Sequence, residues 1–356
     1  MPASSSSMCS IINGSAIEIK ILAEGGVDVK KIINNAADVE REMLEGLVAA
    51  SPGKLVKLKN HNIVLRANLN KNKVALVSGG GSGHEPAHAG YVGFGMLDAA
   101  VAGSVFTSPT AGAILKAIET VANPRGVLCI VKNYTGDVLN FEIAIEKARS
   151  EGITVDYVIV ADDVASQSTA VGRRGVAGTV LVHKIAGALA ETGANLAQVK
   201  MIAQRTIDNV RSMGMAITPC TVPANGVPSF ELSDKEMEIG IGIHGERGMR
   251  REQLTNADGI TRKMLDRILS HLEYAGHEVV VMVNGMGGTP FMELCIVNNF
   301  IKDYLYRNGG IEVYDTMIGN YMTSIEMAGF SLTLLRLDDE LKMYYDAAVD
   351  TFALKK

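Results

Sequence analysis

The chain has 356 residues, of which 47% are hydrophobic and 5% aromatic, and it carries a formal net charge of −5 at pH 7. That length and apolar content are enough to bury one large core or two. Lys and Arg residues are dispersed along the chain and aromatic rings are few, which argues against a nucleic-acid-binding surface.

Residues 1–28 are rich in serine and glycine and have neither a basic start nor a continuous apolar run. We therefore expect a disordered or non-native extension here and no signal peptide. No apolar run elsewhere approaches the roughly 18–20 residues that span a bilayer. The cysteines form no C-x-x-C pair, so we expect neither zinc binding nor disulfides, and a reducing cytoplasm fits; they are Cys9, Cys129, Cys220 and Cys295.

Helical and strand patterns alternate through the first half of the chain. The spacing of apolar residues predicts helices at 38–50, 110–120 and 138–150, and strands at 62–66, 73–77, 99–101, 126–131 and 154–160. Continuous apolar strands between helices are typical of a parallel sheet that is covered on both faces. Ligands bind at the carboxyl ends of such strands, so we expect the loops after Val77 and Val131 to lie close together.

The second half of the chain has a different character. Long helical stretches are predicted at 178–193 and 196–213, and the Pro-containing segment 218–227 suggests a crossing between domains. Residues 236–244 alternate between apolar and polar positions, which predicts a strand that carries His244 on its polar side. Further helices are predicted at 262–274 and 290–307, and further strands at 278–283, 311–318 and 331–337. The predicted fold is therefore α/β with two domains. Residues 29–213 form a first domain with a mostly parallel sheet flanked by helices, and residues 214–337 form a smaller α+β domain.

The sequence SGGGSGHEP at residues 78–86 follows directly on the apolar run 74–77. Glycines let backbone N–H groups approach a ligand closely and adopt positive φ, and such a nest suits an anion or a polyhydroxylated molecule. The spacing matches neither the P-loop nor the dinucleotide fingerprint, and a plain tight turn is the alternative. The pair His84 and His88 is not a zinc motif, because Pro86 interrupts the helix that such a motif needs.

Other candidate site residues each have a structural alternative. In KNYTGD, Lys132 could hold a ligand oxygen or be solvated, and Asp137 could act chemically or cap a helix that starts near residue 138. In GIGIHGERG, the glycines beside His244 clear space for a ligand, and the alternative is an edge-strand histidine that faces water. We expect His183 at a helix surface. The two arginines in GRRGVAG oppose the dipole of the helix they precede, so they meet an acidic partner or lie in a solvated turn.

Taken together and in this order, SGGGSGHEP, FTSPT, KNYTGD, GRRGVAG, TVPA and GIGIHGERG resemble the dihydroxyacetone-binding subunit of the dihydroxyacetone kinase family. The resemblance covers nearly everything after the N-terminal extension. It implies two α/β-type domains, usually in a homodimer, with residues 338–356 returning to the first domain.

The resemblance also implies roles for particular residues. His244 would add to the ketone carbon of dihydroxyacetone to give a hemiaminal, and His84 would hydrogen-bond the ligand and assist proton transfer. Asp137 would accept the proton of the terminal hydroxyl as that hydroxyl attacks a phosphoryl group. The remaining implied substrate contacts are Gly81, Ser82, Gly83 and Lys132, and no metal ligand is implied.

The chain has no P-loop and no second helical domain of the kind that carries nucleotide in this family. We therefore expect no cofactor in this chain, with ADP or ATP and Mg on a partner subunit that is recharged from phosphoenolpyruvate through a phosphohistidine relay. ATP exchange is the alternative for the donor. The alternative to an enzyme is a dihydroxyacetone-sensing transcriptional coactivator, which needs His244 but not Asp137. A kinase subunit for another short ketose, such as erythrulose, is the third.

Overall fold

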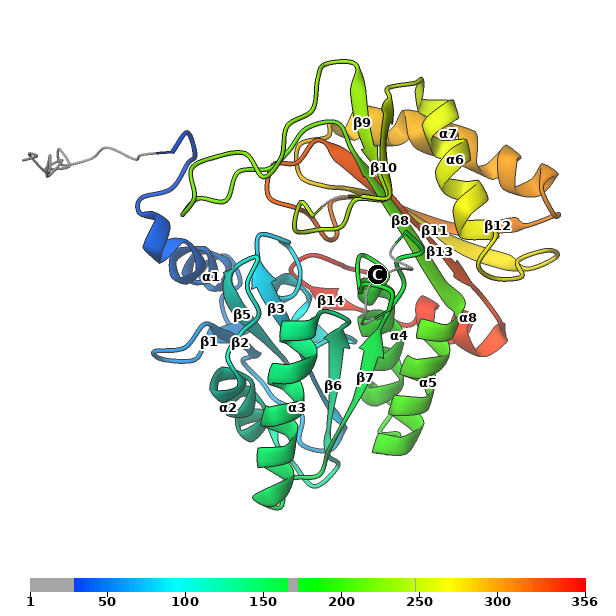
Figure 1. Cartoon of the computed structure of the whole chain (residues 1–356). Coiled ribbons are helices and arrows are strands. Elements are labelled where there is room, and N and C mark those ends of the chain that lie inside the picture. The colour runs from blue at the N-terminus through cyan, green and yellow to red at the C-terminus, as the bar shows by residue number, and fades with distance from the viewer. Residues whose placement is uncertain (1–28, 166–171, 247) are drawn as a thin grey trace, which may run out of the picture.

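A computed structural model of the chain describes residues 29–165, 172–246 and 248–356, so the predicted extension at 1–28 lies outside the described residues. Two six-stranded sheets and the helices around them form five layers (Figure 1). Within the described ranges, no helix is long and apolar enough to cross a membrane.

The first sheet has the strand order β1-β2-β5-β3-β6-β7. Its strands are β1 (Leu55–Lys57), β2 (Ile63–Arg66), β5 (Ala99–Val105), β3 (Ala75–Ser82), β6 (Val127–Lys132) and β7 (Val155–Val160). The four strands from β5 to β7 are parallel, and β1 and β2 form an antiparallel edge. The predicted mostly parallel sheet is therefore confirmed. Helices α2 (Ala111–Val121) and α3 (Thr135–Ser150) cover one face of it.

The second sheet has the order β10-β9-β8-β13-β11-β12, and only β11 and β12 are parallel to one another. Its strands are β10 (Arg250–Gln253), β9 (Glu236–Ile239), β8 (Val210–Ala216), β13 (Gly329–Arg336), β11 (Glu278–Gly285) and β12 (Glu312–Gly319). Helices α6 (Ala257–Leu269) and α7 (Phe291–Arg307) cover its outer face. This second unit mixes helices and strands as predicted.

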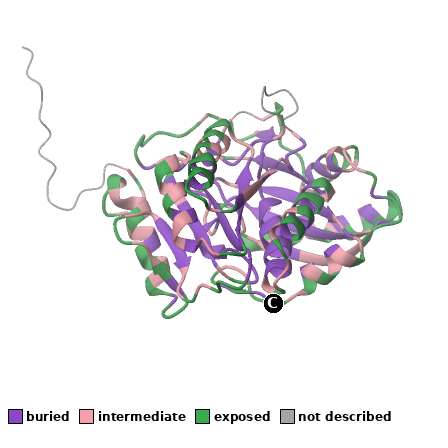
Figure 2. Cartoon of the chain, turned by 90° about the horizontal axis from the view of Figure 1, so that it is seen from below, coloured by how far each residue is buried: buried purple, intermediate pink, exposed green. Residues whose placement is uncertain are grey.

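A layer of helices lies between the two sheets. It contains α4 (Thr179–Glu191), α5 (Leu196–Asn209) and α8 (Asp339–Asp346), and α1 (Val39–Ala49) packs beside it on the first sheet. Helix α4 is buried almost all round, as a helix without a polar face must be. One continuous apolar cluster joins Leu76 of the first sheet to Leu335 of the second through this layer. Figure 2 shows the buried residues concentrated in strands and helices in the interior of the molecule.

The helix predicted at 196–213 ends at Asn209, and the chain continues as strand β8. All seven residues of β8 are buried, and they pair with β13 from Val210↔Leu335 onward. Cross-strand pairing in a buried sheet thus outweighs the local helical pattern. The boundary expected between residues 213 and 214 falls inside this strand. The Ser212 N–H donates to the Asp162 carbonyl at 2.8 Å, so β8 also bonds to the first domain.

The C-terminal segment lies against the first domain. Helix α8 packs on α4, and strand β14 (Asp350–Thr351) pairs with β4 (Gly93–Phe94). The buried Lys184 of α4 donates from Nζ to the carbonyl oxygens of Tyr344, at 3.0 Å, and Ala347, at 2.7 Å. These bonds satisfy carbonyls at the end of α8, where a cation is favoured.

Candidate functional site

The glycine-rich sequence that we expected to be a loop after Val77 is the second half of strand β3, which runs to Ser82. Its glycines permit close packing at the centre of the first sheet. A Cβ at Gly79 would lie 2.5 Å from the Val101 carbonyl oxygen, and a Cβ at Gly80 would overlap Lys132 Nζ. The chain turns only at Gly83, whose φ is +98° and whose N–H donates to the Glu85 carboxylate. A plain tight turn is therefore not what this sequence forms.

The imidazole of His84 is held in one tautomer. Its Nδ1 lies 2.9 Å from the Thr323 carbonyl oxygen, and because a carbonyl only accepts, Nδ1 carries the hydrogen. In the neutral ring Nε2 therefore has a free lone pair, and it has no hydrogen-bond partner among the described residues. Burial, with His244 and Lys132 nearby, lowers the pKa of His84 well below its usual value. The ring thus stays neutral and can accept a hydrogen bond at Nε2.

His244 lies in a turn, and not in the strand predicted at 236–244. Strand β9 ends at Ile239, because Gly240 leaves the ladder with φ +78°. The His244 ring contacts three aromatic rings edge to face, with centroid distances of 4.7 Å to His84, 4.6 Å to Tyr134 and 5.3 Å to Phe106. It is therefore not an edge-strand histidine: it lies in a turn, partly exposed, with three rings packed against it. Burial is the main cause that lowers the pKa of His244 to about 4, so a neutral imidazole faces the site at pH 7.

Lys132 and Asp137 face one another beside these rings. Lys132 ends β6 fully buried, so it is not solvated, and its Nζ lies 3.7 Å from Asp137 Oδ2. Burial lowers the pKa of Lys132, and the nearby Asp137 carboxylate opposes that shift. Asp137 is not a helix cap, because α3 already begins at Thr135. In the first turn of α3 its carboxylate is favoured by the helix dipole.

Four buried polar atoms of this region have no hydrogen-bond partner among the described residues: His84 Nε2, Lys132 Nζ, Tyr134 Oη and Asp137 Oδ1. An unsatisfied buried polar group costs about 1–3 kcal/mol. Four of them beside the His244 ring indicate that a polar ligand supplies the missing partners. The carboxyl ends of β3 and β6 thus meet as predicted, and the described residues contain no cluster suited to hold a metal ion.

The predicted loop residues 81–83 do not all offer side chains to this ligand space. Ser82 Oγ donates to the Gly103 carbonyl at 2.8 Å, so its hydroxyl is turned toward β5. Gly81 packs against the backbone of Phe106 and Thr107, where a Cβ would lie 2.6 Å from the Thr107 nitrogen. Gly83 lies under the Phe106 ring. Their contribution at this edge is close backbone approach.

Some residues of the site were not predicted. Tyr134 lies inside KNYTGD and Phe106 inside FTSPT, so both were within reach of the motif argument. Thr323 comes from a distant loop of the second domain and carries no local signal. His183, expected at a helix surface, is fully buried, and its Nε2 lies 3.0 Å from His88 Nδ1. The reason is that α4 lies between two sheets and has no solvent face.

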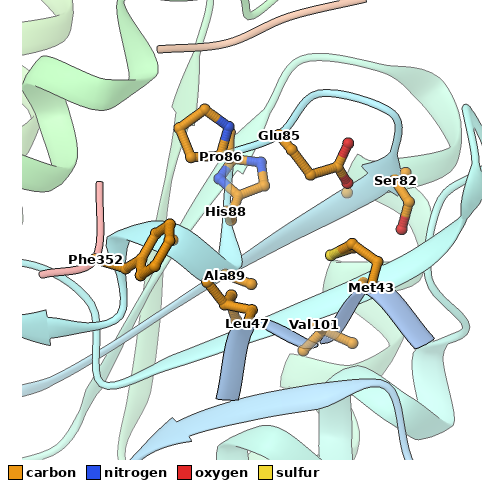
Figure 3. Close-up of a pocket in the computed structure, with 15 residues that line it drawn as sticks. Met43, Leu47, Ser82, Glu85, Pro86, His88, Ala89, Val101 and Phe352 are labelled. Atoms are coloured by element: carbon orange, nitrogen blue, oxygen red, sulfur yellow. The ribbon is translucent and has the colours of Figure 1, made fainter. Parts of the chain in front are cut away.

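A separate cavity of about 360 Å³ lies beside β3, and none of His244, Lys132 and Asp137 lines it. Figure 3 shows Met43 and Leu47 of α1 below it, Phe352 at one side, and His88 between Pro86 and Ala89. Its lining is mostly apolar, so it lacks the converging polar atoms of the His244 site.

The site lies at the edge of a parallel sheet and combines two neutral imidazoles with an ammonium group and a carboxylate. Such a site in a two-domain α/β protein is typical of proteins that bind small polar molecules. The chain is a member of the Dak1 domain family, whose model matches residues 45–353.

Curated relatives share most of this sequence. A Listeria innocua protein named PTS-dependent dihydroxyacetone kinase 1, dihydroxyacetone-binding subunit DhaK, is 50% identical over 315 residues, which are 88% of this chain and 95% of that protein. The Escherichia coli PEP-dependent dihydroxyacetone kinase subunit DhaK is 42% identical, with 92% and 99% covered. Human triokinase/FMN cyclase is 46% identical over 89% of this chain, which spans only 57% of that protein.

Solved structures share the fold. The dihydroxyacetone kinase of C. freundii matches with a TM-score of 0.85 and 38% identity, over 92% of this chain and 60% of that one. The dihydroxyacetone kinase operon co-activator Dha-DhaQ matches with a TM-score of 0.84 and 36% identity, over 88% of this chain and 98% of that one. The proteins that this chain resembles thus carry the names of kinase subunits, of longer kinase chains and of a co-activator.

Proposed function

We propose that this chain is the substrate-binding subunit of a dihydroxyacetone kinase, which binds dihydroxyacetone covalently on His244 and presents a terminal hydroxyl for phosphorylation. The observation that carries the proposal is a set of buried polar atoms beside the neutral His244 ring that have no hydrogen-bond partner in the part of the chain that the structure describes; they are His84 Nε2, Lys132 Nζ and Asp137 Oδ1. Relatives that this chain matches over nearly their whole length are named dihydroxyacetone-binding subunits, which supports dihydroxyacetone as the ligand.

The proposed chemistry begins with the lone pair of a His244 ring nitrogen, which attacks the ketone carbon. The carbonyl oxygen takes up a proton while the other ring nitrogen loses one, so the adduct has the summed mass of its parts. The attacking nitrogen has no second hydrogen to lose, so no neutral imine forms and the addition is reversible. His84 Nε2, with its free lone pair, is placed to carry the proton. The adduct then holds the substrate in one orientation for transfer.

The second step is phosphoryl transfer from a partner. Asp137 accepts the proton of the terminal hydroxyl as its oxygen attacks the terminal phosphorus of the partner's nucleoside triphosphate. The bond from that phosphorus to the nucleoside diphosphate breaks, and the diphosphate stays on the partner. Lys132 donates a hydrogen bond to a ligand oxygen. We place the nucleotide and Mg on a separate subunit and its recharging in a phosphoenolpyruvate-dependent relay, because relatives covered almost end to end carry PTS- or PEP-dependent names. The homodimer implied by the resemblance is part of the same proposal, and light scattering measures it.

The co-activator function is the second candidate, because the Dha-DhaQ structure matches this chain at 36% identity. A sensor needs the His244 adduct but no base for phosphoryl transfer. The buried Lys132–Asp137 pair favours the kinase, because Asp137 Oδ1 has no hydrogen-bond partner in the described ranges and is left to accept a proton.

Rapid-quench mass spectrometry and reconstitution with a nucleotide-carrying partner subunit test the proposal together. We expect the wild-type chain to gain one whole dihydroxyacetone mass and the mixture to form dihydroxyacetone phosphate. Adduct formation without turnover alongside any such partner would favour the co-activator. A chain that shows no adduct under quenching that preserves hemiaminals lacks the covalent mechanism.

The pH dependence of adduct formation is a direct prediction of the depressed pKa of His244. Only the neutral ring attacks, and its pKa of about 4 lies below the ordinary histidine value of about 6.5. The protonated fraction is therefore negligible from about pH 8 down to about pH 5.5, and rises only as the pH approaches 4. We expect rates from rapid-quench mass spectrometry to be flat over that range. A loss of half the rate near pH 6.5 would contradict the assignment.

Gly80→Ala is expected to lower ligand affinity without unfolding the protein. A Cβ there would overlap Lys132 Nζ, the far end of a flexible side chain, so the ammonium moves and the backbone stays. Loss of a charged hydrogen bond costs about 1.5–3 kcal/mol, which is roughly tenfold or more in Kd.

Gly79→Ala is the matched control on the same strand. Its Cβ would meet the Val101 carbonyl oxygen of β5 at 2.5 Å, which is backbone. We expect this variant to lose about 1–3 kcal/mol of unfolding free energy. Calorimetric titration and urea unfolding measure the two effects, and equal loss of stability in both variants would show that Gly80 is only a packing residue.

A further inference from the structure

The turn that carries His244 is held by the carboxylate of Glu246, two residues further on. Glu246 Oε2 accepts a hydrogen bond from the His244 backbone N–H at 2.9 Å. Glu246 Oε1 accepts one from Arg174 Nη1 at 3.0 Å. A Cβ at Gly242 would overlap Glu246 Oε1, so the turn leaves space for this carboxylate. Both oxygens of one side chain are thus used to hold the backbone of the proposed nucleophile.

Arg174 connects this turn to the first domain. It lies in GRRGVAG before α4, and its Nε donates to Asp163 Oδ2 at 2.7 Å, just after strand β7. Its Nη2 donates to the Gly240 carbonyl at 2.9 Å, at the start of the His244 turn. A planar guanidinium with donors at fixed angles can make these three bonds at once, which a lysine cannot. The arginine therefore meets acidic partners, one of the two predicted alternatives.

The charges around the His244 ring come from both domains. The Glu246 carboxylate raises the pKa of His244, while Lys132 and Arg174 lower it, and burial lowers it most. His84, Tyr134 and Phe106 supply the rings packed against it. The Glu246 carboxylate favours protonation of His244. Because Arg174 forms an ion pair with that carboxylate, its positive charge offsets this effect.

We propose that Arg174 and Glu246 are positioning residues for the His244 nucleophile, fixing its turn against the first domain so that the ring faces His84. The proposal rests on the proposed function, in which His244 and His84 act on one ligand although they belong to different domains. Neither Arg174 nor Glu246 has to touch the substrate for this role. A shift of about 1 Å in a reacting group can cost roughly 100-fold in rate.

The test uses Glu246→Gln and Arg174→Met in the full chain, with Arg205→Met as the control. Arg205 also pairs with two carboxylates, those of Asp338 and Glu340, but between α5 and α8. The rate of adduct formation with dihydroxyacetone is measured by rapid-quench mass spectrometry, and the pKa of His244 by NMR titration of its imidazole. We expect both test variants to form the adduct roughly tenfold or more slowly, and Arg205→Met to match the wild type.

The NMR titration separates positioning from general loss of structure. Removing the negative charge in Glu246→Gln lowers the pKa of His244, whereas removing the positive charge in Arg174→Met raises it. Damage to the fold would move both values toward that of a solvated histidine. Wild-type adduct rates in both variants, or pKa shifts of the same sign, overturn the proposal. If Arg174→Met does not fold, Glu246→Gln, which keeps the side-chain shape, decides alone. If the wild type forms no adduct, the proposed function fails, and adduct rates can no longer support the positioning role. The NMR titration then tests that role alone, and an unmoved His244 pKa in Glu246→Gln would refute it.

Discussion

Asp137→Asn is expected to slow phosphoryl transfer by at least two orders of magnitude while the chain still binds its ligand. The amide keeps the size and position of the side chain in the first turn of α3, but it cannot accept a proton. General base catalysis contributes about 10²- to 10⁴-fold to a rate, so we expect kcat to fall by that factor with partner subunit present. Mass spectrometry should still detect the dihydroxyacetone adduct, because His244 and His84 are untouched.

Asp303→Asn is the control for this substitution. Asp303 lies on α7 with an 81% exposed side chain, so its amide variant should behave as the wild type in both assays. Normal turnover of Asp137→Asn with the partner subunit would show that another group takes the proton. Loss of the adduct together with turnover would show that Asp137 acts in binding.

His244→Ala is expected to abolish the adduct and most of the affinity. Without the ring, the ligand is held by hydrogen bonds to His84 and Lys132, which contribute about 0.5–3 kcal/mol each. Such contacts alone leave a triose with Kd near 1 mM, about −4 kcal/mol. We also expect the variant to lose its preference for ketones over glycerol, because only a carbonyl carbon can accept the ring nitrogen.

Competition titrations with dihydroxyacetone and glycerol measure both effects. His277→Ala is the control, since the His277 side chain is exposed and bonds only locally, to the Ala275 carbonyl. An adduct of unchanged mass and yield in His244→Ala would place the covalent bond on another residue, and His84 Nε2 would then be the first to examine.

Much of this arrangement could be predicted from the sequence because parallel strands obey simple rules. Apolar runs predict the central strands, and the rule that ligands lie at their carboxyl ends predicts that His84 and Lys132 lie close together. The structure brings the same groups together, and adds His244 from the second sheet at 4.7 Å from His84. The order of the motifs gave the family, which the Dak1 match confirms.

The remaining features depend on contacts between residues far apart in the chain. Thr323 sets the tautomer of His84 from 239 residues away, and Arg174 reaches Glu246 from 72 residues away. No local pattern encodes such bonds. The predictions at β3 and β8 are wrong for another reason. The glycines of β3 predict a loop and the apolar spacing before β8 predicts a helix, but pairing inside a buried sheet makes both segments strands.

The helices between the two sheets have a consequence for how the molecule melts. Helices α4 and α5 share one apolar cluster with both sheets, and β8 bonds to each side of the boundary. Neither half can lose its structure without exposing the apolar surface of the other, so we expect one heat-absorption peak, with calorimetric and van't Hoff enthalpies that agree. Two resolved peaks would show that the halves are thermodynamically independent. With a single transition, His84 and His244, which lie on opposite sides of that boundary, keep or lose their 4.7 Å ring contact as one cooperative unit.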